Sequence, residues 1–168
     1  MPGFKIGGRG NGPSSTNEMR RTHRWTFAVI SPETRDINVL LKTASRPSFT
    51  FDKPEVHHNQ EKIYYAGKQT WEPVTLTWYD AEQPVDVSER LWTWLNSVSN
   101  IPTANVSHPR DFKGDGDLRM LDGQGVTTEQ WILYNGWPES VNWQALDYSS
   151  SEVQLIEVKY AYDRAERI

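Results

Sequence analysis

Alternation of apolar and polar residues with a period of two recurs along the chain and predicts strands. It is clearest over residues 72–79, where Val74, Leu76 and Trp78 share one face and Thr75, Thr77 and Tyr79 share the other. A strand that buries one face gives this pattern. Similar alternation predicts further strands over residues 25–30, 37–42, 126–134 and 152–163. The chain is therefore expected to be mainly β.

Turn residues between these segments suggest how the strands connect. Ser31-Pro32-Glu33 separates residues 25–30 from 37–42, so these two are expected to pair as a hairpin. The sequence Asn135-Gly136-Trp137-Pro138 predicts a break after the strand that begins at residue 126. On the last strand, 152–163, one face is apolar, and the other is free to meet solvent, a neighbouring chain or a wet channel.

A projecting hairpin is predicted over about residues 48–67. Phe49 and Phe51 alternate with polar residues, and Pro54 marks an edge, a bulge or a strand end because proline cannot donate to the ladder. A polar tip at residues 57–60 then leads into a second strand, 62–66.

Only one segment has helical spacing. Leu91, Trp94, Leu95 and Val98 fall on one face, which predicts a short amphipathic helix over about 87–98 that flanks the sheet. Asp86 is the expected N-cap. Residues 99–124 are rich in Gly, Pro, Asp and Asn and are predicted to form a long loop that orders on assembly.

The composition of the chain predicts its division into domains, and the apolar positions of the elements predict its core. A flexible, Gly-rich, basic arm is expected over residues 1–23, followed by a single domain over 24–168. The predicted core consists of Trp25, Phe27, Leu76, Trp78, Leu91, Trp94, Leu95, Trp137, Ile156, Val158 and Tyr160.

Charge is uneven along the 168 residues. The net charge is −4, yet residues 1–24 hold five Lys or Arg against one acid, which leaves −8 on the remainder. An acidic body argues against wrapping a nucleic-acid backbone, because that affinity comes from basic groups. The basic arm is expected to dock on a neighbour's acidic surface. No apolar run approaches the roughly 20 residues of a membrane span, so no membrane anchor is expected.

Catalytic and cofactor motifs are missing from the sequence. The chain has no Cys, its four His lack metal-ligand spacing, and no nucleophile elbow surrounds a Ser. The Gly-rich run at residues 7–12 lacks phosphate-loop spacing. Asp111, Asp115, Asp117 and Asp122 invite a calcium interpretation, but they do not match an EF-hand loop. We therefore expect neither enzymatic activity nor a cofactor or metal.

Two ordered stretches resemble the tail tube proteins of contractile-tailed bacteriophages. The first is IYYAGKQTWEPVTLTWYDAEQPVDVSERLWTWLNSV, residues 63–98, and the second is WILYNGWPESVNWQALDYSSSEVQLIEVKYAYDR, residues 131–164. Together they cover about 70 residues directly, and the rest follows by colinearity. Type VI secretion and tailocin tube proteins are related to this family. The long basic arm and the acidic 99–124 segment depart from the family pattern.

The resemblance implies an antiparallel β-barrel or sandwich that assembles into hexameric rings. Stacked rings would form the inner tail tube, through which genomic DNA passes without specific binding. The implied partners are other copies of the chain, the tail sheath protein, and the baseplate or tube-initiator and tail terminator proteins. The implied location is the virion tail, assembled in the host bacterial cytoplasm.

Contact residues follow from that role as hypotheses. Glu152 and Glu157 are lumen-facing candidates from the register of the last strand. The candidates for contacts between rings or subunits are Arg20, Arg21, His57, His58, Asn59, Gln60, Glu61, Asp115 and Asp117. Three alternatives stay open: a tube-initiator or baseplate protein, a secretion-system or tailocin tube protein, and a monomeric carbohydrate-binding β-sandwich that stacks sugars on exposed Trp residues.

Overall fold

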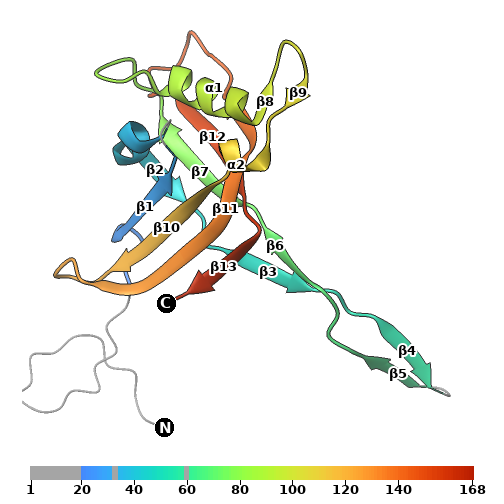
Figure 1. Cartoon of the computed structure of the whole chain (residues 1–168). Helices are drawn as coiled ribbons and strands as arrows, with labels where there is room; N and C mark the ends of the chain where they lie inside the picture. The colour runs from blue at the N-terminus through green and yellow to red at the C-terminus, as the bar shows by residue number, and fades with distance from the viewer. Residues whose placement is uncertain (1–19, 32–33, 59–60) are drawn as a thin grey trace, which may run out of the picture.

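A seven-stranded antiparallel sheet forms the centre of the fold, and the computed structural model describes residues 20–31, 34–58 and 61–168. Within these ranges its order is β1-β10-β11-β12-β7-β2, with β13 beside β11 (Figure 1). The main-sheet strands are β1 (Trp25–Ile30), β2 (Leu41–Ala44), β7 (Val74–Tyr79), β10 (Gly114–Leu121), β11 (Thr127–Trp143), β12 (Leu155–Ala161) and β13 (Arg164–Arg167). The mainly β, antiparallel fold is confirmed.

Shorter elements complete the fold. The additional strands are β3 (Ser48–Phe51), β4 (Glu55–His58), β5 (Glu61–Tyr64), β6 (Gln69–Glu72), β8 (Ser99–Asn100) and β9 (Asn105–Val106). The helices are the 3-10 helix η1 (Arg35–Leu40), α1 (Val87–Val98) and α2 (Pro109–Phe112). The predicted helix is confirmed at residues 87–98, and the Asp86 carboxylate caps it by accepting from the Glu89 backbone N–H at 2.9 Å.

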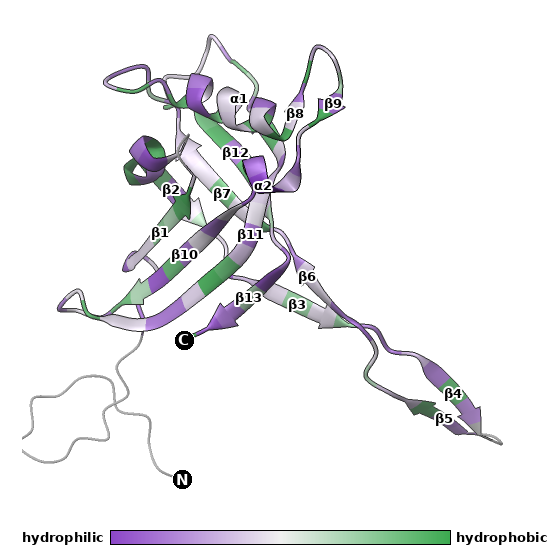
Figure 2. Cartoon of the chain, viewed as in Figure 1, coloured by the Kyte–Doolittle hydropathy of each residue, from purple (hydrophilic) through white to green (hydrophobic). Residues whose placement is uncertain are grey.

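The sheet folds over on itself around one apolar core. Phe27 on β1 meets Tyr160 on β12 edge to face, with ring centroids 6.2 Å apart. Eight of the predicted core residues are buried: Phe27, Leu76, Trp78, Leu91, Trp94, Ile156, Val158 and Tyr160. The helix covers one end of this core through Leu91 and Trp94 (Figures 1 and 2).

Trp25, Leu95 and Trp137 are only half-buried, contrary to the prediction. Trp25 stands at the start of an edge strand, and Leu95 lies beside the buried stripe of α1. The Trp137 ring packs against Phe112 of α2, with centroids 6.1 Å apart. Each of the three is therefore at the margin of the core.

Strand β11 is continuous where the sequence predicted a break. Its first half pairs with β10 and β13, and its second half, from Trp137, pairs with β12. At the bend, Asn135 has a positive φ of 56°, and a Cβ on Gly136 would lie 2.0 Å from Tyr160 ring atoms. The bend thus needs a glycine and a residue tolerant of left-handed backbone. It lets one strand serve both halves of the sheet.

The predicted hairpin between residues 25–30 and 37–42 is wrong. β1 pairs with β10 instead, and residues 35–40 form η1 before β2 begins at Leu41. The helical turn buries Ile37 completely. Burial of that side chain outweighs a strand preference that is weak in itself.

The predicted loop at 99–124 is also wrong, because it contains β8, β9, α2 and β10. Gly and Asp are poor strand formers in isolation. Here Gly116 is needed because a Cβ would stand 3.2 Å from Tyr160 and 3.3 Å from Phe27. Packing against the core therefore overrides the local preference.

The final strand predicted over 152–163 is shorter and is followed by another. Strand β12 spans Leu155–Ala161, and after a bend the chain returns as β13 beside β11. The Asp163 backbone N–H donates to the Tyr134 carbonyl at 3.0 Å across that bend. Of the arm predicted over residues 1–23, residues 1–19 lie outside the described residues.

Candidate assembly interface

A double-stranded ribbon projects from the body between residues 48 and 72 (Figure 1). Strand β3 pairs with β6 at its root and β4 pairs with β5 at its outer end. Backbone bonds continue between the two pairs: Asp52 N–H donates to the Lys68 carbonyl at 2.9 Å, and Gly67 N–H to the Asp52 carbonyl at 2.7 Å. The predicted projecting hairpin is present and runs further than expected, to Glu72.

Glycine at position 67 permits the close approach of the two ribbon strands. A Cβ there would lie 2.8 Å from the Asp52 Cβ and 2.9 Å from the Asp52 carbonyl oxygen. Real Cβ atoms do not approach so closely, so a larger residue would spread the strands.

An aromatic series fixes the root of the ribbon to the body. Ring centroids are 5.8 Å apart between Tyr162 and Trp71, 5.0 Å between Trp71 and Phe49, and 5.3 Å between Phe49 and Phe51. Tyr162 is buried, whereas Phe51 is 53% exposed. The contacts therefore lead from the core outward along the ribbon.

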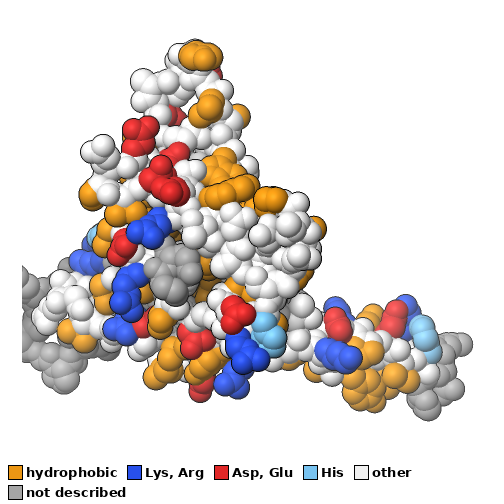
Figure 3. Space-filling view, turned by 45° about the horizontal axis from the view of Figure 1, so that its top comes forward, with side chains coloured by type: hydrophobic (Ala, Val, Ile, Leu, Met, Phe, Trp, Pro, Cys, Tyr) orange, Lys and Arg blue, Asp and Glu red, His pale blue; other side chains and the backbone are white. Residues whose placement is uncertain are grey.

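The ribbon exposes apolar side chains that the described part of the chain leaves uncovered. Figure 3 shows them gathered on the projection, and Figure 2 shows their continuation in β5. They are Phe49, Phe51, Val56, Ile63, Tyr64 and Tyr65, all between 41% and 58% exposed. An isolated two-stranded ribbon is marginal in water, and contiguous exposed apolar surface is typical of an interface.

The tip candidates lie at the far end of this ribbon. His57 pairs in register with Lys62, and His58 with Glu61. Asn59 and Gln60 lie outside the described residues. A salt bridge joins Lys62 Nζ to Glu55 Oε2 at 3.1 Å on the ribbon surface.

The two lumen candidates do not share a strand. Glu152 is exposed in the segment before β12 and is not part of it, contrary to the predicted strand limits. Glu157 lies on β12, in register with Thr77 of β7 and Asn142 of β11. It belongs to the face opposite the buried Ile156 and Val158. Around Glu157 that face of the sheet is polar, with Thr75, Thr77 and Lys159 beside it.

The β10 candidates are held within their own chain. Asp117 accepts from Arg119 Nη2 at 2.6 Å and from Gln130 Nε2 at 3.0 Å. Asp115 accepts from the Asn135 backbone N–H at 3.0 Å, beside the bend in β11. Both carboxylates therefore contribute to the sheet itself.

Arg20 is also engaged internally, whereas Arg21 is exposed. Arg20 forms an ion pair with Glu129, whose side chain is only 4% exposed. Arg167 Nη2 lies 3.5 Å from the same carboxylate, and Trp131 Nε1 donates to it at 2.6 Å. Burial alone would raise the pKa of Glu129, but the indole donor and the arginines outweigh it, so the pKa lies below its ordinary value.

This carboxylate cluster was missed in the sequence, although a signal for it existed. Glu129 occupies an inward position in the alternation that continues through Trp131 and Leu133. A charged residue at a core position needs a partner. Its two arginine partners, however, come from opposite ends of the domain and carry no local signal.

Exposed tryptophans do not form a flat platform of the kind that stacks sugars. Trp92 of α1 and Trp143 of β11 are 44% and 37% exposed, and their ring planes are tilted by 54°. Trp143 Nε1 donates to Ser88 Oγ at 2.9 Å. The pair is a helix-to-sheet contact.

Among the described residues, no three His, Asp or Glu side chains gather in a way that would hold a metal ion. His108 accepts from the Arg110 backbone N–H at the start of α2. No described helix has the length and apolarity to cross a membrane.

Comparison with known proteins shows which family the chain resembles. The model of the family described as T4-like virus tail tube protein gp19 matches residues 22–166. A tail tube protein of Serratia phage KSP90 is 26% identical over 144 residues, which is 80% of each chain.

Solved structures of contractile injection systems share the fold. The tube-terminating cap of the anti-feeding prophage aligns with a TM-score of 0.71 and 17% identity, over 94% of this chain and 95% of that one. The sheath-tube complex of an extracellular contractile injection system in its extended state contains a chain that aligns with a TM-score of 0.67 and 16% identity, over 89% and 91%.

Proposed function

Because the chain belongs to the T4-like virus tail tube protein family, we propose that its copies close into hexameric rings that stack into the inner tube of a contractile tail. The observation that carries this proposal is the projecting ribbon with its uncovered apolar side chains. The role is structural, and the tube performs no chemistry.

The ribbon is the contact between copies. Its aromatic root holds it at a set position on the body, and its outer residues are exposed on both strands. Burial of apolar area contributes roughly 25 cal/mol per Å². Covering the ribbon with a neighbouring ring would therefore stabilise both the ribbon and the stack.

The polar outer face of β7 and β12 is the proposed wall of the lumen. Thr75 and Thr77 stand in register with Lys159 and Glu157 there. A wall of hydroxyls with balanced charge gives DNA no row of cations to bind, so DNA passes through without being held. The acidic character of the body, −8 beyond residue 24, supports the same role.

Partners follow from this position in a tail. We propose a surrounding sheath, a baseplate or initiator at one end and a terminator at the other, with assembly in the cytoplasm of the host bacterium. The similar solved structures, a sheath-tube complex and a tube-terminating cap, support such partners.

Negative-stain electron microscopy of the purified chain tests the proposal. We expect long hollow tubes of uniform width on concentration, because a head-to-tail contact that does not close produces an open stack. Single rings would instead indicate an initiator. A persistent monomer, even with a sheath or baseplate partner supplied, would contradict the proposal.

A surface variant links tube formation to the ribbon. Phe51→Ser should abolish tubes while the chain stays folded, because Phe51 is 53% exposed on the ribbon. Val106→Ser is the matched control, since Val106 is 74% exposed on the β8-β9 hairpin. Deletion of residues 57–61 should act like Phe51→Ser. Normal tubes from both ribbon variants would remove the ribbon from the interface.

A further inference from the structure

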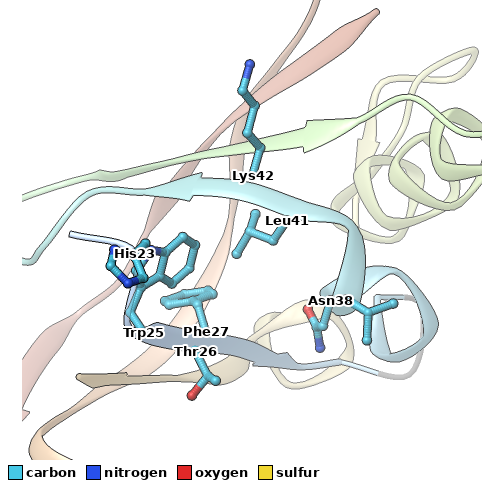
Figure 4. A pocket seen from close by; sticks show the side chains of 8 residues that line it. His23, Trp25, Thr26, Phe27, Asn38, Leu41 and Lys42 are labelled. Carbon is cyan, nitrogen blue, oxygen red and sulfur yellow. The ribbon is translucent and has the colours of Figure 1, made fainter. Parts of the chain in front are cut away.

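A groove of about 490 Å³ separates β1 from β2, the two outer strands of the main sheet (Figure 4). Phe27, Trp25 and Leu41 supply its apolar lining, and Figure 4 shows them between the two strands. His23 and Val39 also line the groove. The sheet therefore folds round its core without pairing its first strand with its last.

Backbone groups of β1 face this groove. The Arg24 carbonyl accepts from Leu121 N–H, toward β10, whereas the Val29 N–H and carbonyl bond the Asn38 side chain at 3.4 and 3.3 Å. The backbone N–H and C=O groups of successive residues in a strand point in opposite directions. Those of Trp25 and Phe27 therefore point the same way as those of Val29.

Asn38 pairs with Val29 as a neighbouring strand residue would. The corresponding backbone groups of Trp25 and Phe27 have no partner within the described part of the chain. Unpaired backbone groups beside an apolar floor are the template that an added strand requires.

We propose that residues 3–7 of a second copy bind in this groove as an additional strand between β1 and β2. Phe4 and Ile6 flank Lys5, so both apolar side chains of such a strand would face Trp25, Phe27 and Leu41. The inference rests on the proposed self-assembly, because its partner is another copy of the chain.

We assign the donor to a second copy because the proposed assembly brings the arm of one chain next to the groove of another. Arg20 pairs with Glu129, so the described end of the arm is held on the body of its own chain. The residues between Ile6 and Arg20 span up to about 45 Å when extended, which is enough to reach a neighbouring subunit.

Cysteine cross-linking tests this in the full chain, which has no native Cys. An Ile6→Cys chain is mixed with an isotope-labelled chain carrying His23→Cys or Val39→Cys and oxidised under assembly conditions. Mass spectrometry then quantifies the mixed disulfide. The control partner is Val106→Cys, 74% exposed against 87% for Val39.

We expect the mixed disulfide with a groove cysteine in severalfold excess over the disulfide with Val106→Cys. Adding Phe4→Ser to the Ile6→Cys chain should lower the yield to the control level. Equal yields with groove and control cysteines would overturn the proposal. An intrachain disulfide in the double variant Ile6→Cys/Val39→Cys, at high dilution, would overturn the assignment to a second copy.

Microscopy of the same samples separates this inference from the proposed function. Tubes without the mixed disulfide would refute the added strand and leave the tube role standing. A mixed disulfide in a sample that forms only dimers would support the strand exchange and contradict the tube.

Discussion

Glu129 joins the two ends of the described domain through one buried carboxylate. Arg20 precedes the first strand and Arg167 belongs to the last, and both are paired with Glu129. Removing one partner of a buried charge leaves the others without compensation. The positions of Arg20 and Arg167 therefore both depend on Glu129 being ionised.

We predict that stability falls in acid through Glu129. Its folded pKa lies below the ordinary value of 4.5, so the unfolded chain binds the proton more readily. The stabilisation is complete well above pH 4.5 and is lost as the pH falls through the folded pKa. Urea midpoints measured from pH 7 to pH 3 should show this loss in the unmodified chain.

The variant Glu129→Gln should lower the unfolding free energy by about 2 kcal/mol at pH 7. Its unfolding free energy should then fall less steeply between pH 7 and pH 3 than that of the unmodified chain. Glu139→Gln, an exposed change on the same strand β11, is the control and should retain the acid-induced loss of stability. If Glu129→Gln lost stability in acid as steeply as the unmodified chain, other carboxylates would be responsible for the acid-induced loss.

At the scale of elements, we expect the ribbon and the body to differ in stability. The ribbon has its own backbone ladder, and the contact between Trp71 and Tyr162 ties its root to the core. Damage to its outer half should therefore leave the main sheet folded.

Gly67→Ala should abolish tubes with little change in the unfolding free energy. The added Cβ would press on Asp52 and misdirect the outer half, β4 and β5. Electron microscopy and urea unfolding measure the two effects, and Ala66→Ser at the exposed neighbouring position is the control. Tubes of normal appearance from Gly67→Ala would mean that the ribbon's direction is unimportant.

Local sequence patterns correctly predicted those elements in which the residues' own structural preference matches the structure that they adopt in the fold. Helix α1 and strand β7 have the expected limits to within two residues, because each has a strict period and one buried face. Strand β10 was missed because its Gly and Asp residues are favoured only by neighbours far away in the chain, β1 and β11.

For the whole molecule, assembly is expected to protect the ribbon from protease. Lys62 and Lys68 are exposed in the single chain, so trypsin should cut after them in the dispersed protein. In assembled tubes those cuts should become slower, since the proposed contact buries the ribbon. Mass spectrometry of timed digests of the same preparation, before and after assembly, measures the ratio. Equal cleavage rates in both states would contradict burial of the ribbon.

The sequence by itself determined the mainly β character, the flanking helix, the projecting ribbon and the family resemblance, because these depend on short periods and contiguous motifs. Only the tertiary structure decided that β1 pairs with β10, that β1 and β2 leave a groove, and that Glu129 meets Arg20 and Arg167. These features join residues far apart in the chain. Their energies come from packing and charge pairing that no local pattern encodes.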